Sequence, residues 1–422
     1  MAEREAPGKA LVVGGSIAGL SCAHALITAG WELTVIEKSS SPSSGSPTGA
    51  GLSLDPQARE IVSSWLLDPA ILNDASLPVD IELLQFLDGQ KKVMQTVARD
   101  DNFNYRCFHW KDLHSLLYKA LPPGIVLWGH QFFSLSISEN KASVQIRVKV
   151  LHTDEMREFS ADLLIAADGS MSTIRQHFLP DHKLRYSGYS AWRGVYDFSK
   201  NIDSDTIGTI RRAYPELGKC LYFDLAYGSH CVLFELRSKR LNWIWYFNTP
   251  EPDIKGRSVT LKASHELIEK MHADSSIMWS SELAWLIRET KSPFINVIYD
   301  SDPLPQLFWG NVVLVGDAAH PITPHCSRST NMSVLDAKVL GLCLKKWGVK
   351  NLGMALQEFQ SIRSPVISSQ VLHSRQAGRL KQGLPLQDNT IFNPKEASSE
   401  EAAQIQHKSL PFFYKAPVSL DL

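Results

Sequence analysis

A glycine-rich turn near the N-terminus is the first feature of the sequence with the residue types to bind a ligand. It lies between the apolar run Ala10–Val13 and the helical pattern Leu20–Thr28. Backbone amides at such a helix start bind a pyrophosphate, and the helix dipole helps them. Glu37 ends the next predicted strand, at the spacing of about 20 residues where a carboxylate binds a ribose diol and repels a 2′-phosphate. The pattern predicts a tightly bound dinucleotide other than NADP. Its candidate contacts are Gly14, Gly15, Ser16, Ile17, Ala18, Gly19, Glu37 and Lys38.

An Asp-Gly turn, Asp168-Gly169, directly follows the predicted strand Asp162–Ala166. A turn at this place exposes backbone amides and a carboxylate at the carboxyl edge of the sheet, where α/β sheets bind ligands. Arg175 stands in the following helix, from which it can reach a phosphate or hold the turn in shape. Taken alone, this motif also fits a plain turn.

A third motif, GDAAHP, starts at Gly316 and follows the predicted buried strand Val312–Val315. Asp317 at a strand end suits the hydroxyls of a ribityl chain, and the helix start at Thr330 and Asn331 stabilises negative charge. Reduced flavin carries its additional negative charge on the pyrimidine side of the ring, so a helix dipole there favours reduction. The three motifs together therefore predict a flavin.

In this order, the motifs resemble those of the class A flavoprotein monooxygenases, single-component FAD enzymes that include para-hydroxybenzoate hydroxylase and 2,6-dihydroxypyridine hydroxylase. The resemblance extends from Lys9 to about Lys346. The runs YGSHCVLFEL and LNWIWYFN are similar to the dihydroxypyridine-hydroxylase branch, and SRSTNMS is similar to plant members. The resemblance implies an α/β fold in which a β-rich (α+β) substrate domain interrupts a Rossmann-like FAD-binding domain. It also implies that NADPH or NADH acts as a transient co-substrate.

The resemblance also implies roles for single residues. In the family the Asp-Gly turn is linked to FAD and to the nicotinamide cofactor, which suggests Asp168 and Arg175. The acid of the third motif binds the ribityl chain, which suggests Asp317, and the proline beside the reactive face of the flavin corresponds to Pro324. Further cofactor contacts are expected at Gly51, Leu52, Arg328, Thr330 and Asn331.

The chain departs from the family pattern at two places. Cys326–Thr330 stands where a glycine-rich stretch lets the backbone approach the ring, and Trp110–Leu113 stands where many members have an arginine in an RxxL pattern. Para-hydroxybenzoate hydroxylase has a lysine at the place of Arg328. This arginine therefore either adds positive charge near the reduced ring or faces solvent.

The implied reaction has three steps. NAD(P)H reduces the flavin, oxygen adds to form a C4a-hydroperoxide, and an electron-rich carbon of an aromatic or heteroaromatic substrate attacks the distal oxygen. Water has to be excluded, so we expect an apolar pocket with few polar groups. The strand that carries Trp243 and Trp245 on one face and Ile244 and Tyr246 on the other can form one wall, or its aromatic residues can belong to the core.

A base that removes a proton from a phenol or a hydroxypyridine would make the ring more nucleophilic. His230, Tyr222, Tyr246 and His325 are candidates, although His230 also fits a structural histidine within a strand. Arg193, in YSGYSAWRG, can bind a substrate carboxylate or the nicotinamide cofactor, or form an interdomain salt bridge. The candidate catalytic residues are His230, Arg193, Tyr246 and Pro324.

The elements that position these residues form an interrupted α/β pattern. The N-terminal strand–helix–strand unit predicts a parallel sheet with a right-handed crossover. Between Tyr186 and Thr249, alternating runs rich in aromatic residues predict an antiparallel sheet. A long helix is expected from Asn331 to Trp347. We expect an FAD-binding domain of 1–75, 96–180 and 290–385, a substrate domain of 76–95 and 181–289, and a C-terminal tail of 386–422.

Composition limits the partners and the compartment. A net charge of −1 over 422 residues gives no basic field for nucleic acid or an anionic membrane. The six cysteines are scattered and fit reduced thiols better than disulfides or a metal site. No signal peptide and no membrane-length apolar run is visible. We expect a cytoplasmic enzyme whose partners are a small aromatic molecule and O₂, with a homodimer as a possible form.

Three other interpretations stay open. The same flavin chemistry can give epoxidation or a Baeyer–Villiger insertion. A Rossmann dehydrogenase that holds NAD and no flavin would explain the glycine turn but leaves the GDAAH motif without a role. A catalytically silent FAD-fold protein would explain the departure at Cys326–Thr330.

Overall fold

The computed structural model describes residues 7–42, 49–88, 93–139, 143–200, 205–254, 258–386 and 388–407. The strands are β1 Lys9–Val13, β2 Glu32–Glu37, β3 Gly51–Leu54, β4 Leu77–Val79, β5 Ile81–Leu87, β6 Val93–Asp100, β7 Tyr105–His109, β8 Val126–Trp128, β9 His130–Ile137, β10 Val144–Val150, β11 Met156–Ala161, β12 Leu163–Ala166, β13 Arg185–Asp197, β14 Cys220–Ala226, β15 Ser229–Leu236, β16 Arg240–Asn248, β17 Thr260–Lys262, β18 Phe294–Asp300, β19 Phe308–Trp309 and β20 Val312–Leu314. The helices are α1 Ile17–Thr28, α2 Pro56–Trp65, α3 Ala70–Asp74, α4 Trp110–Lys119, α5 Thr173–Phe178, α6 Asp205–Ala213, α7 His265–Met278, α8 Ser281–Glu289, α9 Arg328–Trp347, α10 Leu352–Lys381 and α11 Ser399–Gln404, with 3-10 turns η1 Gly316–Ala318, η2 Pro324–Cys326 and η3 Val349–Asn351.

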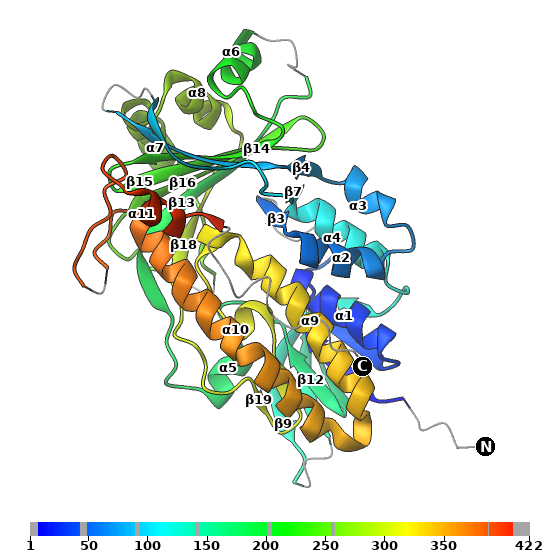
Figure 1. Cartoon of the computed structure of the whole chain (residues 1–422). Helices are drawn as coiled ribbons and strands as arrows, with labels where there is room; N and C mark the ends of the chain where they lie inside the picture. Colours follow the sequence, from blue (N-terminus) through cyan, green and yellow to red (C-terminus); the bar gives the residue numbers. More distant parts are fainter. Residues whose placement is uncertain are drawn as a thin grey trace.

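A six-stranded sheet in the order β19-β20-β12-β1-β2-β8 forms the first half of the molecule (Figure 1). Strands β20, β12, β1, β2 and β8 run parallel, and β19 pairs with β20 in the antiparallel direction. The central strands consist almost entirely of buried Val, Leu, Ile and Ala, as parallel strands covered on both faces require. Helices α1 and α9 and the small sheet β11-β10-β9 share one apolar core with this sheet. The predicted parallel crossover from β1 to β2 is confirmed.

An eight-stranded sheet in the order β17-β18-β13-β16-β15-β14-β5-β6 forms the second half. Its neighbouring strands are antiparallel except for β14 and β5, which confirms the predicted antiparallel character of the aromatic-rich segment. Helices α6, α7 and α8 cover its outer face, as Figure 1 shows at the top of the molecule. The fold is an α/β FAD-binding fold combined with a β-rich half, as the resemblance implied.

Two strands of the eight-stranded sheet cross the domain limits expected from the sequence. Strand β6 continues to Asp100 because it pairs with β5, and β18 pairs with β13 and β17, although 96–100 and 294–300 were expected in the FAD-binding domain. Strands β13 and β18 are distant in sequence, and such a pairing leaves no trace in the local pattern of apolar residues. We therefore propose domain limits that follow the two sheets.

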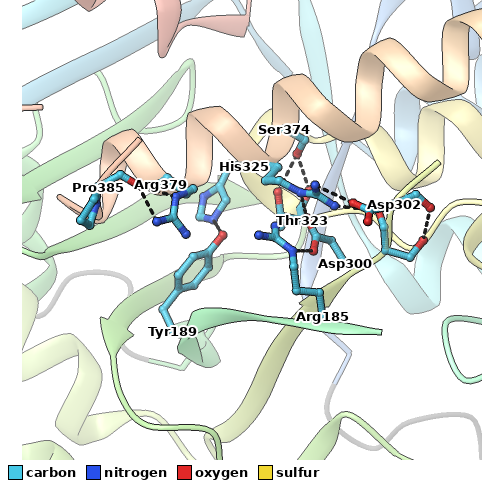
Figure 2. Close-up of polar contacts among 11 residues, drawn as sticks. Arg185, Tyr189, Asp300, Asp302, Thr323, His325, Ser374, Arg379 and Pro385 are labelled. Carbon is cyan, nitrogen blue, oxygen red and sulfur yellow. Dashed lines mark hydrogen bonds and ion pairs between the residues drawn. The ribbon is translucent and has the colours of Figure 1, made fainter. Parts of the chain in front are cut away.

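Helix α10 connects the two halves. It packs along α9 and reaches the eight-stranded sheet, as the orange helix in Figure 1 shows. Figure 2 shows the polar contacts near its C-terminal end, where the Ser374 hydroxyl donates to the carbonyl of Thr323 at 2.6 Å. Asp300, at the end of β18, accepts from both Arg185 and Arg375. The end of α10 is thereby held to η2 and to the second sheet at once.

In the ranges that the structure describes, no helix has the length and apolar character needed to cross a membrane.

Candidate active site

The sequence motifs meet at one edge of the six-stranded sheet. Gly14 follows β1, Glu37 ends β2, Asp168 follows β12 shortly after its end, and Asp317 follows β20. Strands β20, β12, β1 and β2 are consecutive parallel neighbours, so their carboxyl ends lie side by side. This is the edge at which α/β sheets bind ligands. The motifs, which are far apart in the sequence, therefore lie together at one edge of the sheet.

Steric limits explain the glycines of the first turn. Gly14 has φ +109°, and a Cβ there would lie 2.2 Å from the carbonyl oxygen of Ala167. A Cβ on Gly19 would lie 1.8 Å from the carbonyl oxygen of Gly14. Ser16, in contrast, is the N-cap of α1 with φ −81°, an ordinary value for any residue, and its side chain is exposed. The serine therefore fits where the common pattern has a glycine, and the amides of the first turn stay available to a pyrophosphate.

Glu37 supports the glycine turn from the neighbouring strand. Its carboxylate accepts hydrogen bonds from the amides of Gly15 at 2.6 Å and Ser39 at 2.7 Å. A carboxylate has about four acceptor sites, so both oxygens can still bind a ribose diol. Lys38 beside it is exposed. His114, which the sequence did not single out, contacts the carbonyl of Gly15 through Nε2 at 2.8 Å, and burial lowers its pKa.

Arg175 ties the second motif to the third. Its guanidinium is 1% exposed and donates to the carbonyls of Asp317 at 3.3 Å and Ala318 at 2.9 Å. It also donates to the carbonyl of Ser170. Of the two roles considered for this arginine, the observed contacts support holding the turns in shape. Asp168 caps the start of α5 through Oδ2, which accepts from the amide of Thr173 at 2.9 Å, while its buried Oδ1 has no partner.

Asp317 of the third motif is half-buried beside the start of α9. Its Oδ1 accepts from the hydroxyl of Ser329 at 2.7 Å, and burial raises the pKa of the carboxyl. The preceding residue, Gly316, has φ +57°, and a Cβ there would lie 2.8 Å from the side chain of Ala18. The first and third motifs are therefore in direct contact, and a larger residue at either position would separate them.

Arg328 is completely buried, so the solvent-facing alternative for this residue is wrong. Its Nη1 donates to the hydroxyl of Tyr105 at 3.0 Å and lies 3.7 Å from Oδ2 of Asp55. Its Nη2 donates to the carbonyl of His407 at 3.2 Å. Burial raises the pKa of Asp55 to about 6, and the nearby charge of Arg328 limits that rise. Arg328 thus places a positive charge at the start of α9 without exposing it to water.

Asn331 acts on the backbone of the neighbouring strand. Its amide nitrogen donates to the carbonyls of Ser53 at 3.0 Å and Ser327 at 2.6 Å, and its oxygen accepts from the amide of Asp55 at 3.0 Å. The amide of Gly51 donates to Oδ1 of Asn242 at 2.7 Å. These contacts fix strand β3, which carries Gly51 and Leu52, against the start of α9. Asn242 was not among the residues that the sequence indicated.

A cavity of about 400 Å³ joins this edge to the eight-stranded sheet. On one side it is lined by Gly51, Leu52, Asp317, Pro324, Ser327, Arg328 and Thr330. On the other side it is lined by Arg193, Leu221, Phe223, His230, Val232, Phe234, Ile244 and Tyr246. Most of the second group is apolar, and it stands on alternate positions of β14, β15 and β16. The cavity therefore brings five of the expected cofactor contacts together with the four candidate catalytic residues. The glycine turn, Glu37, Lys38, Asp168, Arg175 and Asn331 are not part of its lining.

Side chains alternate between the two faces of the sheet, and this places the two candidate tyrosines on opposite faces. Tyr246 faces the cavity, whereas Tyr222 lies on the helix-covered face, where its hydroxyl accepts from the amide of Glu216 at 2.9 Å. Tyr222 as a base is therefore wrong. Of the aromatic strand, Ile244 and Tyr246 form the cavity wall, and Trp243 and Trp245 belong to the core under the helices.

The polar groups of the cavity gather around Tyr246. The imidazole of His230 stacks on its ring, with centroids 4.5 Å apart and an interplanar angle of 14°. Burial raises the pKa of the Tyr246 hydroxyl, and the charge and hydrogen bond of Arg193 oppose that rise. His325 follows Pro324 on η2, and Figure 2 shows it pointing at Tyr189, whose hydroxyl lies 2.8 Å from its Nε2. Burial lowers the pKa of His230 to about 3 and that of His325 well below its ordinary value.

Three buried atoms at this end of the cavity have no hydrogen-bond partner: Nε of Arg193, Nε2 of His230 and Nδ1 of His325. Buried polar atoms are normally paired, so these positions fit the polar groups of a bound molecule. Along the carboxyl edge of the six-stranded sheet, the glycine turn, the unpaired Oδ1 of Asp168 and the half-buried Asp317 fit the phosphates and hydroxyls of FAD. The residues present thus suit FAD along the edge of the six-stranded sheet and a second, smaller ligand in the cavity.

Comparisons with known proteins agree with this geometry. Residues 8–192 match the model of the FAD binding domain family. The chain is 27% identical over 374 residues to 3-amino-4-hydroxybenzoate 2-monooxygenase of Streptomyces platensis, an alignment that covers 87% of each protein. Among solved structures, 2,6-dihydroxypyridine-3-hydroxylase from Arthrobacter nicotinovorans superposes with a TM-score of 0.75 at 22% identity, covering 92% of this chain and 98% of that chain. HpxO of Klebsiella pneumoniae, solved with FAD and uric acid, gives 0.73 at 20% identity, covering 96% and 95%.

The fold and the site define an FAD-dependent oxidoreductase. More narrowly, it is an FAD-dependent monooxygenase with FAD as its cofactor and NAD(P)H as reductant, and it is similar to single-component FAD-dependent aromatic monooxygenases.

Proposed function

We propose that this enzyme hydroxylates an electron-rich aromatic or heteroaromatic molecule that carries a hydroxyl or carboxylate substituent. The observation that carries the proposal is the composition of the cavity: its wall on the eight-stranded sheet is mostly apolar, and the unpaired atoms of Arg193, His230 and His325 stand beside it. Such a pocket holds a planar apolar ring and orients it through a few polar contacts.

Different residues of the cavity have different roles in the proposed reaction. The wall of Leu221, Phe223 and Ile244 excludes water from the ring. Arg193 binds an anionic substituent, and charge-assisted hydrogen bonds from a guanidinium suit a carboxylate or a phenolate. His230, neutral because of its lowered pKa, accepts a hydrogen bond from a hydroxyl. FAD, when bound and reduced by NADPH or NADH, supplies the activated oxygen.

The assignment to substrate binding makes Arg193 more than an interdomain contact. It stands on β13, directly opposite Ile244 of β16, and both residues line the cavity. An ion pair between α10 and the eight-stranded sheet is instead made by Arg375, with Asp300. We therefore infer that Arg193 serves the ligand.

Anaerobic reduction of the purified holoenzyme tests the proposal. With NADPH or NADH, the flavin absorbance should bleach, and it should bleach faster when a hydroxylated aromatic acid such as 3-hydroxybenzoate is present. In air with labelled dioxygen, mass spectrometry should detect a product with one added oxygen atom from O₂. Bleaching followed only by hydrogen peroxide, across a panel of phenols and hydroxypyridines, would contradict the proposal.

We also propose a cytoplasmic location and a homodimer. All six cysteines are buried and unpaired, which suits a reducing compartment. A fluorescent fusion and light scattering of the purified protein would test the two statements separately.

A further inference from the structure

His230 is held at one ring nitrogen and free at the other. It lies on β15, is fully buried, and its Nδ1 is 2.8 Å from Oε1 of Gln382. Its Nε2 has no hydrogen-bond partner among the residues that the structure describes, although the residue lines the cavity. A neutral imidazole has one donor and one acceptor nitrogen, and the partner of the first decides the role of the second.

A short chain of hydrogen bonds decides which nitrogen carries the proton. The backbone carbonyl of Gln382 can only accept, and Nδ2 of Asn248 donates to it at 3.0 Å. The side-chain oxygen of Asn248 therefore faces Gln382 and accepts from its Nε2 at 2.9 Å. This orients Oε1 of Gln382 toward His230. Turning the Gln382 amide over would set two oxygens against each other at Asn248.

The partners hold this arrangement firmly. Gln382 is the C-cap of helix α10 and is fully buried, with its own amide donating to the carbonyl of Gly378 at 3.0 Å. Asn248 ends strand β16 and is exposed. Stacking on Tyr246 fixes the plane of the His230 ring. The orientation thus comes from three elements, α10, β15 and β16, that are distant in sequence.

We propose that Gln382 and Asn248 are positioning residues that hold His230 as the Nδ1–H tautomer, so that Nε2 offers its lone pair to a hydroxyl or ring N–H of the substrate. This inference rests on the proposed function for the identity of the ligand. The tautomer itself follows from the protein contacts alone. A fixed Nδ1–H tautomer predicts that the site binds substrates that donate a hydrogen bond to Nε2. Substrates that can only accept a hydrogen bond at this position should bind more weakly.

The surroundings disfavour the charged form of His230. Burial and the positive charge of the buried Lys381 lower its pKa, and His325 lies 5.2 Å away between ring centroids. A neutral ring with a fixed proton is the form that discriminates between donors and acceptors.

Nitrogen NMR of the holoenzyme labelled with ¹⁵N-histidine tests the tautomer without any substrate. His230, assigned by its loss in His230→Phe, should show a proton-bearing Nδ1 and a bare Nε2. In Gln382→Met, which keeps the length of the side chain but removes the acceptor, the two tautomers should mix. Gln376→Met, the same change at an exposed glutamine of α10 that donates to Gln404, should leave the wild-type signal. A proton on Nε2 in the wild type, or an unchanged signal in Gln382→Met, would overturn the proposal.

Ligand binding tests the acceptor role. The perturbation of the flavin spectrum by 2-naphthol and by its methyl ether gives two dissociation constants. The wild type should bind the methyl ether about tenfold more weakly, because Nε2 then stays buried without a donor. His230→Phe, which preserves the stacked ring, should bind both within about threefold. Equal affinities in the wild type would overturn the acceptor role. The NMR experiment uses no substrate, so a failure of the tautomer proposal can be told from a failure of the proposed function. The proposed function fails if aromatic compounds neither hasten flavin reduction nor gain an oxygen atom.

Discussion

The carboxylate of Asp336, on helix α9, accepts a hydrogen bond of 2.9 Å from the backbone amide of Gly316, the first residue of the Gly-Asp turn. The same carboxylate contacts Nε2 of His320 at 2.6 Å and accepts from Nε of Arg363 at 2.9 Å. Burial alone would raise the pKa of Asp336, but the charges of His320 and Arg363 outweigh it and hold the pKa at about 2. The turn that presents Asp317 is therefore supported from inside the protein by a buried ionic cluster.

Asp336→Asn should weaken this support strongly. The variant leaves the guanidinium of Arg363, 1% exposed, without its counter-ion, and breaking a buried pair costs about 3–5 kcal/mol. We expect a lower urea midpoint and a lower flavin content. Asp154→Asn, which changes an exposed carboxylate paired with Lys149, should leave both unchanged. A variant at Asp336 that unfolds at the wild-type midpoint would show that the cluster contributes nothing to stability.

Asp317→Ala should lose flavin while the protein stays folded. Asp317 lines the cavity and has one fixed partner, Ser329, so its removal takes away a contact to the cofactor more than a support of the fold. A charged hydrogen bond is worth about 1.5–3 kcal/mol, so the affinity for FAD should fall roughly 10- to 100-fold. Titration of the apoprotein with FAD, followed by flavin fluorescence, measures the change.

Ser329→Ala is the matched control for this experiment, because it removes the partner and keeps the carboxylate. Its affinity for FAD should fall much less than that of Asp317→Ala. Unchanged flavin content in Asp317→Ala would show that the acid of the third motif is not a cofactor contact.

The sequence predicted the parts of the site that are local. The glycine turn, Glu37 and the Gly-Asp turn are visible because each is a strand end with its own steric signature, such as the contact of Gly19 with Gly14. Residues that act across the fold were missed. Asp336 reaches Gly316 from a helix, and Gln382 reaches His230 across 152 positions. No spacing rule marks such pairs.

Two further differences have physical causes of the same kind. Tyr222 and Tyr246 look alike in sequence because both faces of their sheet are apolar, and only the positions of α6, α7 and α8 decide which face is closed. Helix α10 continues through Pro365, a residue that normally ends a helix. Its packing against α9 outweighs the local preference.

Arg193→Gln should weaken the binding of aromatic acids and leave the flavin in place. The variant keeps a polar side chain on β13 but removes the charge that faces the cavity, so the dissociation constant of 3-hydroxybenzoate should rise about 10- to 100-fold. The flavin spectrum during ligand titration reports it. Arg185→Gln, on the same strand but paired with Asp300, is the control and should keep the wild-type constant. An equal loss in both variants would show that the effect comes from the strand and not from the ligand contact.

Acid should destabilise the protein through its buried histidines. In the folded protein the pKa of His230 is about 3 and that of His373 about 4, against 6.5 for an ordinary histidine. Between these values the unfolded chain therefore binds protons that the folded chain does not bind. The associated stability is complete above about pH 6.5 and is lost as the pH falls toward 3. His230→Phe removes one such group, and the slope of unfolding free energy against pH should fall by up to about 1.4 kcal/mol per pH unit inside this window. Urea unfolding at a series of pH values measures the slope, and His265→Gln, at an exposed position, should keep it. Identical slopes for the wild type and His230→Phe would mean that His230 is protonated in the folded protein, against both its burial and its position beside Lys381.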